Sequence, residues 1–320
     1  MTLLEVLRAR RRIAPYVRRT PFVRSSWLSD LTGADVFLKL ESVQHSNSFK
    51  SRGAFNAIVA RLERAASALT RLVTASAGNH GRALAAAAET FGLPLTVFTP
   101  ADAPTTKLTA ISRHGAELRA EGRDYDEAER MAKAFALDTG AAFISPYNDA
   151  DVIAGAATAA LEIFEDAPGI DTLVVPVGGG GLISGVAAVA KGLSAASTVV
   201  GVEVEASCAF QTSVRAGKLV KIVPGPTLAD GLGGNPDPET ITFEPIQRLV
   251  DRIVTVSEPA LEAAVVGLVT AEHLITEGAG AAATAAIIGR RVDLSGRRAA
   301  VVVSGANIDR QRLAGLLGKT

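Results

Sequence analysis

The chain has 320 residues and a mass of 33.0 kDa, which at roughly 150 residues per domain predicts about two domains. Lysine plus arginine and aspartate plus glutamate both number 33, so the formal net charge is zero. This balance excludes general nucleic-acid binders and basic membrane-surface proteins, because both classes need an excess of positive charge. The single cysteine, Cys208, excludes an internal disulfide and multi-cysteine zinc sites. It suits a reducing compartment, and we expect the cytoplasm.

The first twenty residues are strongly basic, with six arginines against one acidic side chain, Glu5. The apolar segment of a secretion signal does not follow them, and Leu3, Leu4, Leu7 and Ile13 recur at helical spacing. We therefore expect a surface helix with a solvated basic face. No uninterrupted apolar run in the sequence reaches the roughly 18 residues of a membrane span, so we expect no membrane partner.

Short apolar runs rich in valine alternate with longer helical stretches along the chain. In chain order, the runs predict strands at Val36–Leu40, Leu72–Thr74, Leu95–Phe98, Ala142–Ile144, Leu173–Val177, Val199–Val204 and Ala299–Val303. The stretches between them predict helices at Ser51–Arg64, His80–Phe91, Tyr125–Leu137, Val152–Phe164, Leu182–Gly192 and Glu258–Thr276. This alternation indicates an α/β fold, with parallel sheets covered by helices on both faces.

The segment Val223–Pro238 has the densest turn composition in the chain, with four prolines and four glycines. Such a segment predicts either a long functional loop or a crossing between elements. The sequence has no serine- and glycine-rich linker, charge block or internal repeat. Composition alone therefore does not locate a domain boundary.

The motif Ser48-Phe49-Lys50 places a lysine where a helix is predicted to begin. The helix dipole disfavours a cation at that end. The same positive potential, together with burial, would lower the pKa of Lys50 and supply the neutral amine that Schiff-base chemistry needs. Its position alone does not distinguish it from an ordinary solvated lysine.

A second motif, Ser76-Ala77-Gly78-Asn79-His80, lies between a predicted strand and a predicted helix. Ser76 and Asn79 are residue types that cap helices, and the free N–H groups of such a turn can hold a carboxylate. A plain helix cap and a carboxylate-binding loop are both open on this motif.

Four consecutive glycines, Gly178–Gly181, form a third motif between a predicted strand and a predicted helix. Their backbone N–H groups can close on an anion, and the helix dipole adds positive potential there. Four glycines cost more backbone entropy than a plain turn needs, which favours phosphate binding. Gly179, Gly181 and Gly185 are also a loose version of the dinucleotide fingerprint, and Glu203 follows Gly181 by 22 residues, where a ribose-binding acid is expected. A nicotinamide-dependent dehydrogenase is therefore an alternative.

The fourth motif, Ser304-Gly305-Ala306-Asn307, follows the apolar run Ala299–Val303. Parallel α/β sheets bind ligands just beyond the carboxyl ends of their strands. The glycine run, the motif that begins at Ser76 and the motif that begins at Ser304 each follow a predicted strand. We expect these three at the same edge of one sheet, converging on one site.

In this order and spacing, the four motifs resemble those of the fold type II pyridoxal-phosphate enzymes, most closely the threonine and serine dehydratases and their serine racemase relatives. The resemblance extends from Ile13 to the C-terminal strand and helix. It implies a tryptophan synthase β-like fold, in which residues 1–65 and 147–320 form a large domain and residues 66–146 form a small domain that closes over the substrate. It also implies a homodimer or another homo-oligomer, and leaves no chain for the regulatory domain of biosynthetic threonine dehydratases.

The resemblance gives each motif a role. Lys50 would form a Schiff base with pyridoxal 5′-phosphate and remove the Cα proton of the substrate. Phe49, Asn79 and Ser304 would contact the cofactor ring, Asn79 at the phenolic oxygen and Ser304 at the nitrogen. The remaining residues are the phosphate-binding Gly178, Gly179, Gly180, Gly181 and Leu182, and the carboxylate-binding Ser76, Ala77, Asn79 and His80. A single phosphate then accounts for the glycines, because a dinucleotide has no use for Lys50.

The implied activity is β-elimination from a β-hydroxy amino acid such as L-threonine or L-serine, which yields a 2-oxo acid and ammonia. A neutral hydroxyl at Ser304 makes the ring a weaker electron sink than an aspartate would, which suits elimination better than transamination. Racemisation needs a second proton donor, and serine racemases that resemble this chain carry a serine where Ala77 stands. A racemase of the same fold is the alternative, and Ala77 favours elimination.

The sequence departs from the family pattern in three places. Glu203 matches a glutamate of the family's cation site, but Ala209 stands where racemases have an aspartate, so the resemblance gives weak support for a divalent or monovalent cation. The segment Gly155-Ala156-Ala157-Thr158 replaces the commoner Gly-Gln-Gly-Thr, which removes a polar group. The loop Asp230–Pro238 also departs from the usual dehydratase sequence, so the preferred side chain of the substrate is not fixed.

Overall fold

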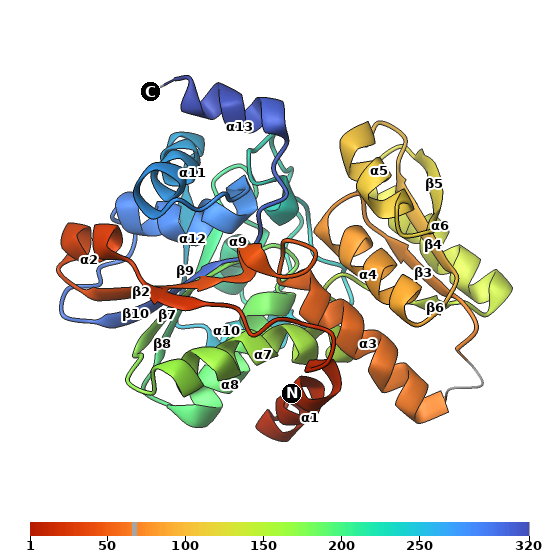
Figure 1. Ribbon diagram of the computed structural model, residues 1–320, viewed down its shortest axis with the longest axis horizontal. Helices are drawn as coiled ribbons and strands as arrows, with labels where there is room; N and C mark the ends of the chain where they lie inside the picture. The colour runs from red at the N-terminus through yellow and green to blue at the C-terminus, as the bar shows by residue number, and fades with distance from the viewer. Residues whose placement is uncertain (66–68, 320) are drawn as a thin grey trace.

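The structure is a computed structural model that describes residues 1–65 and 69–319 (Figure 1). The first half of the chain contains α1 (Leu3–Ile13), β1 (Phe22–Arg24), α2 (Ser26–Thr32), β2 (Asp35–Leu40), α3 (Lys50–Ala65), β3 (Leu72–Ala75), α4 (Asn79–Thr90), β4 (Leu95–Pro100), α5 (Thr105–Ser112), β5 (Glu117–Gly122), α6 (Tyr125–Thr139) and β6 (Ala142–Phe143). The second half contains α7 (Ala150–Asp166), β7 (Thr172–Pro176), α8 (Gly181–Leu193), β8 (Thr198–Val204), α9 (Ala209–Ala216), α10 (Phe243–Leu249), β9 (Arg252–Val256), α11 (Glu258–Glu272), α12 (Gly278–Ile288), β10 (Arg298–Val303) and α13 (Arg310–Leu317). Strands and helices alternate, as the apolar pattern predicts.

The larger sheet has six strands in the order β1-β2-β10-β7-β8-β9. All neighbours are parallel except β1, which pairs antiparallel with β2 at the edge. Helices α1, α7, α8 and α10 contribute to the core on one face, and α2, α11 and α12 to the core on the other. Because both faces are covered, the central strands are valine-rich and buried. The α/β prediction is confirmed.

The smaller sheet has four parallel strands in the order β5-β4-β3-β6. Helices α3 and α4 pack on one face and α6 packs on the other. Figure 1 shows this sheet and its helices as a group beside the six-stranded sheet, with α3 running from one towards the other. All four strands fall between Leu72 and Phe143, inside the segment 66–146. The domain boundaries themselves stay a prediction.

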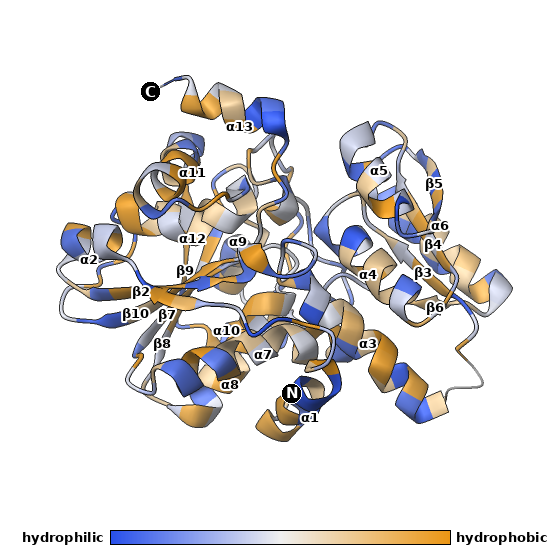
Figure 2. Ribbon diagram, viewed as in Figure 1, coloured by the Kyte–Doolittle hydropathy of each residue, from blue (hydrophilic) through white to orange (hydrophobic). Residues whose placement is uncertain are grey.

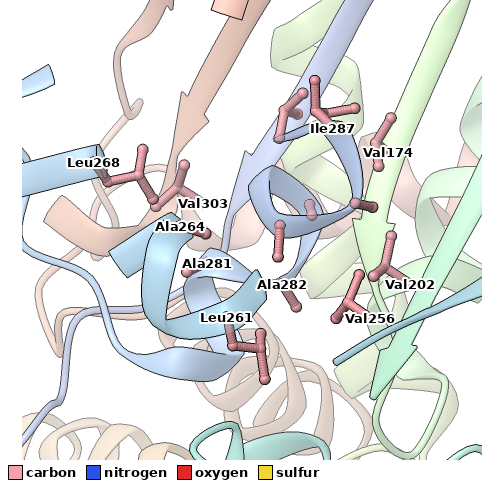
Figure 3. Packing of buried hydrophobic residues seen from close by; sticks show 14 of the residues in the cluster. Val174, Val202, Val256, Leu261, Ala264, Leu268, Ala281, Ala282, Ile287 and Val303 are labelled. Carbon is pink, nitrogen blue, oxygen red and sulfur yellow. The ribbon is translucent and has the colours of Figure 1, made fainter. Parts of the chain in front are cut away.

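Small side chains let α12 lie close to the larger sheet. Figure 3 shows Ala282 of α12 beside Val202 and Val256 of the strands, with Leu261 of α11 nearby. Figure 2 shows hydrophilic residues gathered at exposed positions such as the first turn of α13. Within residues 1–65 and 69–319, no helix is long and apolar enough to cross a membrane.

Helix α1 is the predicted N-terminal surface helix, but its buried face differs from the expected one. Val6, Ala9 and Ile13 are buried, whereas Leu4 and Leu7 are 56% and 39% exposed. The spacing of leucines therefore predicts the helix and misplaces its apolar face. A capping box between Thr2 and Glu5 starts the helix.

The predicted helix Glu258–Thr276 is wrong at its C-terminal end. Helix α11 ends at Glu272, His273 adopts a left-handed conformation with φ 56°, and α12 begins at Gly278. The segment between them brings Glu277 to the cavity described below. The other predicted strands and helices form, with ends displaced by one or two residues.

Candidate active site

A cavity of about 1090 Å³ lies where the two sheets meet. Its lining includes Lys50 at the start of α3, Ser76 and its neighbours after β3, Gly178–Gly181 after β7 and Ser304 after β10. The expectation that the last three share one sheet edge is wrong. Strands β7 and β10 belong to the six-stranded sheet, whereas β3 belongs to the four-stranded sheet. The motifs converge because the carboxyl edges of two different sheets face the same cavity.

Lys50 is held against the end of β10. The N–H of Phe49 donates to the carbonyl of Ser304 at 3.1 Å, and Ser48 forms an antiparallel bridge with Gly305. Lys50 Nζ donates to the carbonyl of Pro146 at 2.7 Å. Burial lowers the pKa of Lys50 to about 8, against the opposing charge of Glu277. A fraction of the Lys50 side chain is therefore a neutral amine near neutral pH, as predicted. The main cause of the lowered pKa is desolvation.

Side chains packed around the glycine run leave no room for a Cβ at Gly179 or Gly180. A Cβ on Gly179 would lie 2.2 Å from the ring of Tyr147. Gly180 has φ +85°, and a Cβ there would lie 2.7 Å from Ile246 Cδ1. Thr242 Oγ1 donates to the carbonyl of Gly179 at 3.0 Å, which fixes the turn. Helix α8 begins at Gly181, so its first N–H groups have no intrahelical acceptors and form an anion cradle at the cavity.

The segment Ser76–His80 forms a turn of backbone, and the predicted caps are wrong. Gly78 is the N-cap of α4 and no side chain caps the helix. Ser76 Oγ instead accepts from the N–H of Gly78 at 3.2 Å. Without a side chain over its end, the N-terminus of α4 faces the cavity through Asn79 and its neighbours. A carboxylate can bind there.

His80 is buried and neutral. Its Nε2 lies 3.2 Å from the carbonyl of Ile144, and its Nδ1 has no hydrogen-bond partner within the described part of the chain. Burial, with a smaller effect of Lys50, lowers the pKa of His80 to about 3. The imidazole therefore adds a polar group without a charge to the cavity.

Asn79 is held from both sides. Its Nδ2 donates to Glu277 Oε1 at 2.5 Å, and its Oδ1 accepts from Asn307 Nδ2 at 2.5 Å. Burial raises the pKa of Glu277 to about 7, although the bond from Asn79 opposes the rise. Sequence reasoning missed Glu277. The available signal was an isolated carboxylate within an apolar, alanine- and glycine-rich stretch.

Ser304 is buried at the end of β10 and lines the cavity. Its Oγ makes one long hydrogen bond, to the carbonyl of Ala279 at 3.4 Å. Such a contact is weak, so the hydroxyl can turn to a ligand. It brings a neutral donor and acceptor to the site, as the sequence predicts.

Glu203 is buried at the N-terminus of α9 and is not among the residues that line the cavity. It is 2% exposed, and its two carboxylate oxygens accept from the N–H groups of Phe210 and Gln211 at 2.8 and 2.7 Å. The carboxylate thus closes the N-terminus of α9, outside the cavity lining, so its position gives no support to the ribose-binding role of the dehydrogenase alternative. A role of Glu203 in a cation site stays a prediction from the resemblance. The described residues contain no group of three metal-ligating side chains.

The segment Val223–Pro238 is a long loop that lines the cavity. Lys107 of α5 forms an ion pair with Asp230 of this loop. Lys133 of α6 forms a second with Asp237 at 2.6 Å. The segment is therefore a long loop at the cavity, and its function stays a prediction.

The lining of the cavity fits a phosphorylated aldehyde. A lysine of lowered pKa can condense with a carbonyl group, and an anion cradle built from N–H groups and closed to any Cβ suits a phosphate. Asn79 and Ser304 offer hydrogen bonds to a polar ring between them.

Known proteins agree with this chemistry. The family model of pyridoxal-phosphate dependent enzymes matches residues 13–305. An L-threonine ammonia-lyase of Thermotoga maritima is 40% identical over 319 residues, which cover 100% of this chain and 79% of that one. A catabolic L-threonine dehydratase of Staphylococcus aureus is 35% identical, over 99% of this chain and 92% of that one. The structure of maize serine racemase is 31% identical with a TM-score of 0.92, over 99% of this chain and 97% of that one.

Proposed function

Because the chain belongs to the family of pyridoxal-phosphate dependent enzymes, we propose that it is an ammonia-lyase that acts on L-threonine or L-serine. The reaction removes the Cα proton and the β-hydroxyl group and yields a 2-oxo acid and ammonia. The observation that carries the proposal is Lys50, a lysine of lowered pKa in the same cavity as the glycine cradle. The relatives named for threonine support the choice of a β-hydroxy substrate.

In this proposal each side of the cavity holds one part of the cofactor. The N–H groups from Gly178 to Leu182 bind the phosphate, Phe49 and Asn79 contact the ring, and Ser304 faces the ring nitrogen. When bound through Lys50, pyridoxal phosphate supplies the electron sink that stabilises negative charge at Cα. The neutral Ser304 hydroxyl leaves the ring nitrogen without a counter-charge, which favours elimination over transamination.

Lys50 also acts as the base in this proposal. Once its amine is free of the cofactor, the lowered pKa leaves a useful fraction uncharged near neutral pH. The uncharged Nζ accepts the Cα proton. The carbonyl of Pro146, which lies 2.7 Å from Nζ, accepts a hydrogen bond and orients the amine.

The turn Ser76–His80 binds the substrate carboxylate in this proposal. The N-terminus of α4 provides N–H groups and positive potential. His80 is neutral, so it adds no charge that would shift the pKa of Lys50. Ala77 lines the cavity and has no proton to give. Racemisation, which needs a donor on the second face of Cα, is therefore disfavoured.

We also propose that residues 66–146 form a small domain that closes over the substrate against the large domain of residues 1–65 and 147–320. The ion pairs of Lys107 and Lys133 with the loop Val223–Pro238 support closure, because they join helices of the smaller sheet to that loop. A homo-oligomer and the cytoplasm stay predictions from the sequence.

The test is an assay of the purified protein with pyridoxal phosphate and a panel of β-hydroxy amino acids. We expect equal amounts of 2-oxo acid and ammonia from L-threonine or L-serine, without added nicotinamide. Lys50→Ala is expected to fold and to lose turnover, because one amine serves both attachment and proton removal. Turnover near that of the unmodified protein in Lys50→Ala would contradict the proposal.

A further inference from the structure

Four side chains beside the cavity form one continuous hydrogen-bonded series, here named the amide chain: Arg82, Asn307, Asn79 and Glu277. Arg82 Nη1 donates to Asn307 Oδ1 at 2.6 Å. Asn307 Nδ2 donates to Asn79 Oδ1, and Asn79 Nδ2 donates to Glu277 Oε1, each at 2.5 Å. The amide chain thus runs from a cation to a carboxylate through two amides.

The chemistry of its two ends dictates which way both amides face. A guanidinium only donates hydrogen bonds, so Asn307 must turn its oxygen to Arg82. Asn307 Nδ2 is then left for Asn79 and for the carbonyl of Ser46 at 2.9 Å. Asn79 must turn its oxygen to Asn307 and its NH₂ group to Glu277, which accepts when ionised. Turning over one amide alone would set two donors or two acceptors against each other.

This direction leaves one hydrogen of Asn79 Nδ2 free. Glu277 uses the other, and an amide NH₂ group carries two. Had the amide faced the opposite way, Asn79 would present an acceptor to the cavity instead of a donor. A phenolic oxygen that carries negative charge binds to a donor and is repelled by an acceptor.

Within the described residues, the side chain of Arg82 makes few polar contacts. It is half-buried, forms no ion pair there, and its side-chain hydrogen bond is the one to Asn307. Burial and the neighbouring Arg113 lower the pKa of Arg82. The second donor to Asn307 Oδ1, Asn47 Nδ2, lies at 3.4 Å and is weak. Arg82 is therefore the main donor to Asn307 Oδ1, and it acts together with the carbonyl of Ser46, which accepts from Asn307 Nδ2.

We propose that Arg82 is a positioning residue, which orients Asn307 and through it Asn79 so that one Asn79 hydrogen faces the phenolic oxygen of the cofactor. The inference rests on the proposed contact between Asn79 and the ring. Removing the guanidinium takes away the donor to Asn307 Oδ1, so that mainly the carbonyl of Ser46 and the carboxylate of Glu277 still hold the two amides in this orientation. The Asn79 donor is then held less firmly at the phenolic oxygen of the bound cofactor, and the pKa of the cofactor changes.

The experiment compares Arg82→Met, Arg82→Lys and Arg113→Met. Arg113 is the matched control, because it is an exposed arginine close enough to influence Arg82 and outside the amide chain. Two quantities are measured: the dissociation constant for pyridoxal phosphate, by titration of the cofactor-free protein, and the pH dependence of the absorbance bands of the bound cofactor. Arg82→Met is expected to weaken binding about 3- to 10-fold and to shift the pH midpoint between the bands. Arg82→Lys, which keeps a donor, and Arg113→Met are expected to match the unmodified protein.

Equal changes in Arg82→Met and Arg113→Met would overturn the proposal, because they would reflect loss of charge alone. So would an unchanged Arg82→Met. If circular dichroism shows that Arg82→Met does not fold, Asn307→Asp takes its place, since a carboxylate cannot donate to Asn79 Oδ1; the same loss is expected, and no loss would overturn the proposal. The variant Asn79→Ala distinguishes a failure of the role of Arg82 from a failure of the proposed contact between Asn79 and the cofactor. If it changes both measurements while Arg82→Met does not, only this inference fails; if it changes neither, the proposed contact of Asn79 fails as well.

Discussion

Burial of Lys50 changes what its amine can do at neutral pH. Its pKa is lowered to about 8, because desolvation outweighs the opposing charge of Glu277. Its position at the start of α3 was readable from the sequence, as was its place in a motif. The burial of Lys50 could not be predicted from the sequence, because the carbonyl of Pro146 and the carboxylate of Glu277 lie far along the chain.

The lowered pKa predicts how the cofactor-free protein takes up pyridoxal phosphate at different pH values. Only the uncharged amine attacks an aldehyde, so attachment speeds up as pH rises through the pKa of Lys50. We expect the rate to rise up to about pH 8 and to level off above it. Stopped-flow absorbance of the reconstitution measures this rate. A rate that keeps rising to the ordinary lysine value of about 10.4 would contradict the lowered pKa.

Ala77 predicts the stereochemical outcome of the reaction. It is half-buried in the lining and offers no acidic proton, so a carbanion at Cα is not reprotonated from that side. We expect L-threonine or L-serine to be consumed with little D-isomer formed. Ala77→Ser is expected to raise D-isomer formation while elimination continues. Chiral chromatography of the unreacted substrate decides, and rapid D-isomer formation by the unmodified protein would overturn this account.

Helix α3 carries Lys50, and buried charges anchor its first turn. Arg52 donates to Glu41 Oε2 at 2.8 Å and to Glu162 Oε1 at 2.7 Å, and Lys39 donates to Glu162 at 2.6 Å. All four side chains are at least nine-tenths buried. They join α3 to β2 and its following turn, and to α7. The helix that bears the reactive lysine is therefore tied to the larger sheet.

Arg52→Met is expected to lower the free energy of unfolding by about 3–5 kcal/mol, because it leaves two buried carboxylates without their main partner. Arg64→Met, at the exposed end of the same helix, removes a surface ion pair with Asp151 and is expected to cost less than about 1 kcal/mol. Urea unfolding of both variants measures the difference. Equal stability losses would show that the buried network does not anchor α3.

Sequence patterns predicted the buried strands and missed the more exposed strands β1, β5 and β9. The apolar runs of β7 and β10 have no competing interpretation, because both faces of their sheet are covered. Strand β5, Glu117–Gly122, was missed because it is a mostly exposed edge strand with charged residues. The break between α11 and α12 was missed because no proline marks it and the apolar pattern continues across it.

The arrangement of the two sheets explains why the site could be predicted only in part. Three of the four motifs directly follow a strand, and that much is local information. Nothing local tells to which sheet a strand belongs, so Ser76 was expected at the same edge as Ser304 and lies on the other sheet. The pair of Lys107 with Asp230, across 123 residues of sequence, likewise leaves no local pattern. Contacts between distant segments complete this cavity.

If Lys50 carries pyridoxal phosphate in this cavity, the covalent bond to the cofactor lies on its Nζ, and that bond can be located by chemical mapping. The protein is purified with the cofactor, reduced with borohydride, digested and mapped by mass spectrometry. We expect the mass of the reduced cofactor on the peptide that contains Lys50, and no attachment in Lys50→Ala treated in the same way. Attachment at another lysine, such as Lys107 at the rim of the cavity, or no attachment at all, would contradict the account.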